Sequence, residues 1–587
     1  MPRSEQITFG PQVCGSLAVD AGGGREWLVT DGLGGFASGT VSGLRTRPSH
    51  ALLTVGDHAA LAALDLTVTL PTGTRITLFT HQWESGAIDP AGHRFLETFT
   101  LASGLPRWRW RIGDVVIERE LALRNGHPSL AVVHRVVSAP EPVGLAVAAM
   151  CTWRETDGVR HASDPPPVAE PVADGVVIED AYRLAGPGWQ PGGFWHLGVR
   201  AGDHAEDLWL AGTFFQQTGP GGGMEISAWG GTLSERPPAA SVVIAAERER
   251  AHRLVTLSKT EGYAETLALS ADRFVVRTAE GVDVLAGYPS PEHDPATTMA
   301  AYEGLFLDTG RAEEGRELLI RHARARDPQG SPYAPLWLVH AVDRHVTRTG
   351  DSDLAARLAV PLARLLRRWI GSFPADGLLQ LSPSGKHVDV NALWVNALAA
   401  MADLLAEARL DDTEPRALHA RARDSFVSRF PAPEGWLHDV VEGPAATYPL
   451  GAGAHHDDPT LRPGQLFAWS LPHAPMRGLT GTALRAAGES LLTPLGLRTL
   501  APGEYGYRST GDGRVLPWLI GAYADACDAI GRPVEGLLTG LEAHLSEWGT
   551  GSVSEYADGD APHHGAGRPF SARSVAEVLR VKQRYTP

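Results

Sequence analysis

The chain has 587 residues and a formal net charge of −16, so it is long enough for two apolar cores and is expected to divide into two domains. Its acidic balance argues against a nucleic acid partner, because binding a phosphate backbone requires a basic surface. The cysteines Cys14, Cys151 and Cys527 are odd in number and far apart, so we expect no disulfide framework and a reducing, cytoplasmic location.

The sequence shows no apolar run of about 18 residues and no charged segment leading into an apolar one. We therefore expect neither a membrane span nor a signal peptide. A neutral polymer such as a polysaccharide is compatible with the negative charge.

Short alternating apolar runs bounded by turn residues fill residues 25–260, and this period is typical of half-buried strands. Residues 64–80 predict two strands around the turn 71–73, and residues 108–123 predict a second pair around 113–114. The pattern continues at residues 176–184, 194–199, 208–215 and 241–246. About a dozen such strands predict a large antiparallel β-sandwich over residues 1–270. We place Trp108 and Trp110, which share one face of a strand, in its core.

From about Pro295 the apolar period becomes helical. Asp294 supplies an N-cap before a proline at the first helical position, and Gly310 and Gly350 can end helices in the left-handed conformation. Candidate helices cover residues 298–309, 335–349, 391–410, 415–430, 480–492, 517–530, 534–548 and 572–582. With shorter segments they form close to six pairs, which predicts an α/α toroid over residues 285–587. Periodicity alone equally allows an irregular bundle or a solenoid.

Segments near both ends of the chain carry recognisable motifs. Residues 25–44 read REWLVTDGLGGFASGTVSGL, and residues 551–556, 558–563 and 574–580 read GSVSEY, DGDAPH and SVAEVLR. They resemble the opening and the carboxyl-terminal signature of the prokaryotic glycogen debranching enzyme (amylo-alpha-1,6-glucosidase) family. The resemblance implies an amino-terminal antiparallel β-sandwich followed by an (α/α)6 toroid, no cofactor or metal, and removal of α-1,6-linked glucose from a branched α-glucan.

Inverting glycosidases use two carboxyl groups, a protonated acid and an ionised base that activates water. The resemblance places the base at Glu555; the alternative is a loop carboxylate kept for hydrogen bonding. The family carries its acid between a Gly-Leu-Leu turn and a helix start. Here residues 376–379 (DGLL) run almost directly into residues 385–394 (GKHVDVNALW), and residues 380–384 contain no carboxylate. The acid segment is therefore predicted to be missing.

The resemblance also implies substrate contacts, at Asn391, Trp394, Gln465 and Trp518. Other positions that would handle sugar depart from the family pattern, whereas framework positions fit it. Tyr333 stands in place of an aspartate and Arg573 in place of a tryptophan. Together with Arg514 and Arg568, these residues predict a cleft that is bulkier and more positive than the family's.

Two classes of function fit this pattern. The first is a non-catalytic or weakly active family member that binds an α-glucan, another carbohydrate or a protein partner. The second is an active inverting hydrolase in which Glu555 works with a relocated acid, such as Asp389, Asp512 or Asp558. The run 455–458 (HHDD) looks like a metal cluster, but adjacent residues cannot all point at one ion, and we expect no metal site.

Overall fold

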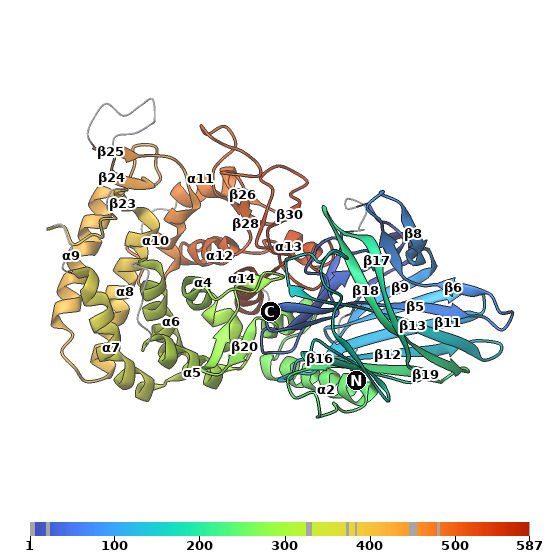
Figure 1. Ribbon diagram of the computed structural model, residues 1–587. Coiled ribbons are helices and arrows are strands. Elements are labelled where there is room, and N and C mark those ends of the chain that lie inside the picture. The colour runs from blue at the N-terminus through green and yellow to red at the C-terminus, as the bar shows by residue number, and fades with distance from the viewer. Residues whose placement is uncertain are drawn as a thin grey trace.

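The computed structural model describes residues 6–18, 24–324, 331–370, 375–381, 384–444, 455–477 and 482–585. The β-rich amino-terminal part lies beside a helical carboxyl-terminal part (Figure 1). Each part has its own large apolar core. The predicted sequence of a β-sandwich followed by an α/α toroid is confirmed.

The sandwich consists of two large antiparallel sheets. One sheet has the order β1-β9-β10-β11-β12-β19-β16-β15-β14 and the other the order β17-β18-β13-β5-β4, with β6 also paired to β5. The strands of the first sheet are β1 (Ile7–Phe9), β9 (Leu96–Ala102), β10 (Leu105–Ile112), β11 (Val115–Leu123), β12 (Ser129–Ser138), β14 (Ala169–Val172), β15 (Gly175–Ile178), β16 (Tyr182–Ala185) and β19 (Gly223–Gly230). Those of the second are β4 (Leu53–Val55), β5 (His58–Thr69), β6 (Arg75–Thr77), β13 (Val143–Glu155), β17 (Gln190–Ala201) and β18 (His204–Thr218).

Both predicted hairpins are present, as the pairs β5–β6 and β10–β11. Trp108 and Trp110 on β10 are only 6% and 5% exposed. Side chains two apart on a strand share a face, and here that face is packed in the sandwich, which confirms their assignment to the core.

The predicted strand at residues 241–246 is wrong, because these residues begin helix α2 (Ala240–Ser258). Val243, Ile244 and Ala251 are buried whereas Val242 is 56% exposed, which is a helical stripe and not an alternation. The apolar run alone did not distinguish a strand from a helix, and the charged helix formers that follow it extend the helix. Because α2 and α3 (Tyr263–Asp272) follow the last sandwich strand, the domain boundary between residues 270 and 285 stays a prediction.

The helical part is a closed ring of inner helices, each preceded along the chain by an outer helix. Contacts run from α4 through α6, α8, α10, α12 and α14 and back to α4. The inner helices are α4 (Pro295–Ala300) with its π-helical continuation η3 (Glu303–Leu307), α6 (Tyr333–Thr349), α8 (Val388–Glu407), α10 (Phe467–Ser470) preceded by η4 (Pro463–Leu466), α12 (Leu519–Ala529) and α14 (Ala572–Tyr585). The outer helices are α3, α5 (Ala312–His322), α7 (Ser352–Ile370), α9 (Thr413–Arg429), α11 (Thr482–Ser490) and α13 (Thr539–His544).

The predicted helix ends agree with the structure where local chemistry fixes them. The Asp294 carboxylate accepts hydrogen bonds from the backbone amides of Ala296 and Thr297, both at 3.2 Å. Gly310 and Gly350 both adopt a φ of 73°, which glycine reaches without the penalty of a Cβ. The alternation of outer and inner helices brings the amino-terminal ends of the inner ones to one end of the ring, which we call the mouth.

Helix α8 has the length and apolar composition of a membrane-spanning segment, unlike our expectation from the sequence. In the structure it is an inner helix of the toroid, and 89% of its most apolar window is buried inside the protein. Core helices of this kind meet the same criteria of length and composition as a membrane span.

Candidate functional site

Two of the predicted site residues meet polar neighbours at the mouth of the toroid. Tyr333, the first residue of α6, donates its hydroxyl hydrogen bond to Asp389 Oδ2 at 2.7 Å. Asp389 Oδ1 in turn accepts a hydrogen bond from the backbone amide of Val390 at 2.8 Å. Burial and the Asp389 carboxylate raise the pKa of Tyr333 above its ordinary value, so the phenol stays protonated and keeps donating.

Asp439 adds a second carboxyl group close to Asp389. It was not among the site residues predicted from the sequence, because no motif or spacing marks it. Its carbonyl accepts a 2.9 Å hydrogen bond from Val388 N, which ties the residue before β24 (Val440–Pro444) to the start of α8. Burial, and after it the charge of Asp389, raise the pKa of Asp439 to about 7; Arg462 opposes this weakly, with its Nε 3.6 Å from Asp439 Oδ2. A carboxyl group with this pKa is partly protonated at neutral pH.

Arg573 at the start of α14 lies against the predicted sugar-contacting residue Trp518. Its guanidinium carbon is 3.2 Å from the centroid of the Trp518 ring and 5.8 Å from that of Trp337. Phe467 packs against both indoles, with centroids 6.1 and 5.6 Å away. Arg573 forms no ion pair within 4 Å in the part of the chain that the structure describes, and its Nε is buried without a hydrogen-bond partner. Burial lowers the pKa of Arg573 to about 10.

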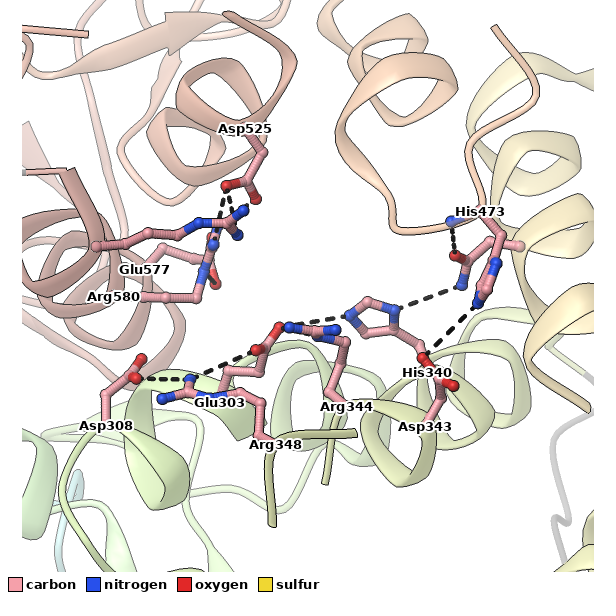
Figure 2. Close-up of polar contacts among 12 residues, drawn as sticks. Glu303, Asp308, His340, Asp343, Arg344, Arg348, His473, Asp525, Glu577 and Arg580 are labelled. Atoms are coloured by element: carbon pink, nitrogen blue, oxygen red, sulfur yellow. Dashed lines mark hydrogen bonds and ion pairs between the residues drawn. The ribbon is translucent and has the colours of Figure 1, made fainter. Parts of the chain in front are cut away.

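A cavity of about 170 Å³ extends from Arg573 into the interior of the ring. Charged residues from η3, α6, α12 and α14 line it and pair with one another, as Figure 2 shows. The pairs are Arg344 Nε with Glu303 at 3.1 Å, Arg580 with Asp525 at 2.8 Å and with Glu577 at 2.9 Å, and Arg584 with Asp525 at 3.3 Å.

Two titratable groups of the cavity wall, Glu303 and His340, have pKa values far from neutral pH. Although burial opposes it, the nearby Arg344 and Arg580 lower the pKa of Glu303 to about 2. Burial lowers the pKa of His340 to about 4. At neutral pH Glu303 is therefore ionised and the His340 imidazole is neutral.

Three of the predicted substrate contacts are buried in the protein, and their roles in binding stay predictions. Asn391, Trp394 and Gln465 are at most 1% exposed. Asn391 binds the backbone of Leu379 through both its amide oxygen and its amide nitrogen, and Trp394 Nε1 donates to Gly377 O at 3.1 Å. The Gln465 side chain is bound in the same way, to backbone atoms of residues 437 and 462. These side chains hold the loops that surround the mouth, and of the predicted contacts Trp518 alone faces the cavity.

Glu555 is not among the residues that line this cavity. Its Oε2 accepts a hydrogen bond from the backbone amide of Arg568 at 3.2 Å, and the Arg568 side chain pairs with Glu292 at 2.8 Å. Asp512 is exposed and Asp558 is half-buried. Within the described residues, no hydrogen bond or ion pair joins either of them to Glu555, so the roles of all three as acid or base stay predictions.

A metal site is not suggested by the donor groups that the structure describes. No group of three or more His, Cys, Asp or Glu side chains among the described residues could hold a metal ion. The backbone of residues 455–458 forms strand β25, and the side chains of residues 455 and 456 lie outside the description.

Comparison with known proteins agrees with the two-part fold. Residues 25–187 match the family described as glycogen debranching enzyme N terminal, and residues 381–580 match amylo-alpha-1,6-glucosidase. The fold is similar to that of a bacterial glucoamylase solved in complex with acarbose, with a TM-score of 0.57, 12% identity, and coverage of 100% of this chain and 98% of the other. A putative kojibiose phosphorylase from the human microbiome is more distant, with a TM-score of 0.47 at 8% identity over 98% of this chain and 88% of the other.

One curated relative is not named as a glycogen debranching enzyme. Acetyl-coenzyme A carboxylase carboxyl transferase subunits beta/alpha of Parafrankia sp. (strain EAN1pec) is 27% identical over 351 residues. The match covers 59% of this chain and 49% of the relative, so the chain spans about half the length of that protein. Identity at this level over part of each chain does not transfer an activity.

The sandwich, the toroid and the matches on both parts define a carbohydrate-active protein. More specifically, the chain belongs to the glycogen debranching enzyme-like family.

Proposed function

We propose that this protein binds a carbohydrate at the mouth of its toroid and that its α-1,6-glucosidase chemistry is lost or strongly altered. The observation that carries the proposal is the contact of the Arg573 guanidinium with Trp518 at 3.2 Å. A sugar ring would need that face of the indole for stacking. The cation therefore replaces the neutral sugar platform that the family resemblance implies.

The loop before α8 also supports altered catalysis. Leu381 and Gly385 exchange backbone hydrogen bonds of 2.9 and 3.0 Å, which closes the loop tightly where the family carries its acid. The carboxylate of Asp376, on the same loop, lies 2.6 Å from Lys386 Nζ, and Lys386 is only 2% exposed. This ion pair engages the Asp376 carboxylate with a side chain of the protein itself.

A second function is favoured by the burial of the Asp439 carboxyl group close to Asp389, which raises the pKa of Asp439 to about 7. A carboxyl group that is partly protonated at neutral pH has the property required of a general acid. In this alternative, the protein is an active inverting hydrolase in which Asp439 donates the proton and Glu555 activates water. Inversion would require the two carboxyl groups to lie about 6.5–9.5 Å apart.

A hydrolysis screen on the purified protein tests the two functions against each other. Limit dextrin and an isomaltose-type disaccharide are the substrates, and Asp439→Asn and Glu555→Gln are the variants. We expect no more than trace turnover, because loss of general acid catalysis alone removes about 10²–10⁴-fold in rate. Robust turnover that both variants abolish would replace our proposal with the second function.

The ligand is proposed as an α-glucan or another carbohydrate, and a protein partner is a further proposal.

Cys14, Cys151 and Cys527 are all buried free thiols. Unpaired cysteines are typical of reducing compartments, which supports our proposal that the protein is cytoplasmic.

A further inference from the structure

We propose that the mouth is specific for an acidic saccharide, whose carboxylate or phosphate group binds Arg573. This inference rests on the proposed binding of a carbohydrate and names the class of ligand. It is carried by the contrast between Arg573, which is half-buried and has no carboxylate partner among the described residues, and three other arginines of the cavity that have one.

Three arginines of the cavity wall have carboxylate partners from neighbouring helices. Arg344 pairs with Glu303, and Arg580 and Arg584 pair with Asp525. Arg573 lines the same cavity but has no carboxylate within ion-pair distance among the described residues. The cavity thus pairs three of its arginines with carboxylates and leaves the half-buried Arg573 without one, whereas Arg477, also without an ion pair among the described residues, is exposed to solvent.

The acidic groups closest to Arg573 are already engaged elsewhere. Glu577 binds Arg580 through both of its oxygens, at 3.2 and 2.9 Å. Asp294 caps α4. The Tyr333 hydroxyl donates to Asp389. A rearrangement that paired Arg573 internally would break one of these bonds.

An unpaired cation in a partly buried site is costly, and the aromatic contacts offset only part of that cost. Cation–π contacts are weak compared with the hydration that an ion loses when it is buried. An anionic group of a ligand would supply the missing charge. The guanidinium offers planar, paired donors, which match a carboxylate or a phosphate.

The rest of the mouth suits a sugar attached to that anionic group. Trp337, Trp518 and Phe467 form an apolar wall beside Arg573. On the far side of Tyr333, Asp389 and Asp439 present carboxyl oxygens that can accept hydrogen bonds from sugar hydroxyls. These two carboxyl groups would repel an anion placed next to them, so they also fix which end of the ligand lies at Arg573.

Calorimetry on the full-length protein at pH 7 tests the inference with four ligands: glucose, glucuronate, glucose 1-phosphate and inorganic phosphate. We expect at least one of the two acidic sugars to bind at least tenfold more tightly than glucose. We also expect this advantage to shrink at high salt, because the attraction is electrostatic. The two acidic sugars distinguish a carboxylate ligand from a phosphate ligand.

Substitutions at Arg573 then test whether this residue causes the preference for acidic sugars. Arg573→Gln should remove at least nine-tenths of the added affinity for the acidic sugar, and Arg573→Lys, which keeps the charge without the planar fork, should retain part of it. The matched control is Arg477→Gln, because Arg477 is exposed at the other end of the cavity and, among the described residues, its side chain donates to Pro472 O alone. This control should bind as the wild type does.

Several results would overturn the inference. One is that glucose binds as tightly as both acidic sugars; in that case the proposed carbohydrate function stands without its anionic specificity. Another is an equal loss of affinity in Arg477→Gln. Binding of inorganic phosphate as tight as that of glucose 1-phosphate would reduce the site to an anion site without sugar recognition. If no saccharide binds, neutral or acidic, the proposed function itself fails. If Arg573→Gln does not fold, the salt dependence of acidic-sugar binding to the wild-type protein still tests whether the preference is electrostatic.

Discussion

Arg25 Nε lies 2.6 Å from the carbonyl oxygen of Ser546, which joins the amino-terminal motif to the segment just before the carboxyl-terminal signature, 521 positions further along the chain. The contact continues at Glu26, whose backbone amide donates to Trp548 O at 2.7 Å and whose carbonyl accepts from Thr550 N at 2.8 Å. The amino-terminal motif thus supports the loop that leads to Glu555. This interface gives both motifs a structural reason to persist, whether or not the site still catalyses hydrolysis.

The first prediction concerns the Glu26 side chain, which is 3% exposed and pairs with Arg47 at 2.9 Å and His50 at 3.2 Å. We expect Glu26→Gln to lower the free energy of unfolding by about 3 kcal/mol, because it leaves a partly buried cation without its partner. Thermal and urea unfolding measure the effect. Glu97→Gln is the control, since Glu97 pairs with Arg111 at the surface and such pairs contribute about 1 kcal/mol or less. Equal effects of the two substitutions would contradict the structural role of Glu26.

The second prediction concerns how the ionisation of Asp439 makes the stability of the fold depend on pH. Its folded-state pKa of about 7 lies above the value of about 3.9 for an unfolded aspartate. The folded protein therefore holds this proton more tightly, and ionisation of Asp439 destabilises it progressively as the pH rises from about 4 to about 7. Asp439→Asn should unfold at a higher temperature than the wild type at pH 8, and this gain should vanish near pH 4. Asp512→Asn, at an exposed site, should show no gain at either pH. A gain that is independent of pH would contradict the raised pKa.

Sequence reasoning succeeded where the deciding interactions are local. The N-cap at Asp294 and the helix end at Gly350 depend on neighbouring residues, and the structure has them as predicted. Gly310 is left-handed as expected, but the helix before it already ends at Leu307. Sequence reasoning failed at residues 241–246, because a short apolar run fits a strand and a helix equally well until its tertiary contacts are known.

The site was less predictable, because its geometry joins residues that are distant in the chain. Arg573 was named as a residue that would make the cleft more positive, but its stacking on Trp518 depends on how α12 and α14 pack. Asp439 was missed, because its raised pKa comes first from its burial and then from Asp389, fifty positions earlier. Asn391 and Trp394 match the family motif, and only their burial shows that they hold a loop.

The third prediction tests that role of Asn391. Its amide group satisfies Leu379 N, Leu379 O and His387 O at 2.7, 3.1 and 2.9 Å. Asn391→Ala leaves these buried groups unpaired and should cost about 2–4 kcal/mol of unfolding free energy. Thermal unfolding gives the cost, with Gln217→Ala at an exposed position of β18 as the control. A variant of unchanged stability with weakened ligand binding would restore Asn391 as a substrate contact.

The last prediction concerns how the Arg573 cation affects the binding of neutral sugars. With Arg573 on Trp518, maltotetraose should bind with a dissociation constant of about 1 mM or weaker, equivalent to about −4 kcal/mol. Removing the guanidinium in Arg573→Ala uncovers the indole, so we expect maltotetraose to bind more tightly, by about three- to tenfold, as an added stacking contact of about 1 kcal/mol would give. The double variant Arg573→Ala with Trp518→Ala should lose this gain. Calorimetry measures all three proteins under one condition. Micromolar binding of maltotetraose to the wild type, lost on Trp518→Ala, would show that Trp518 still serves as a sugar platform with Arg573 in place.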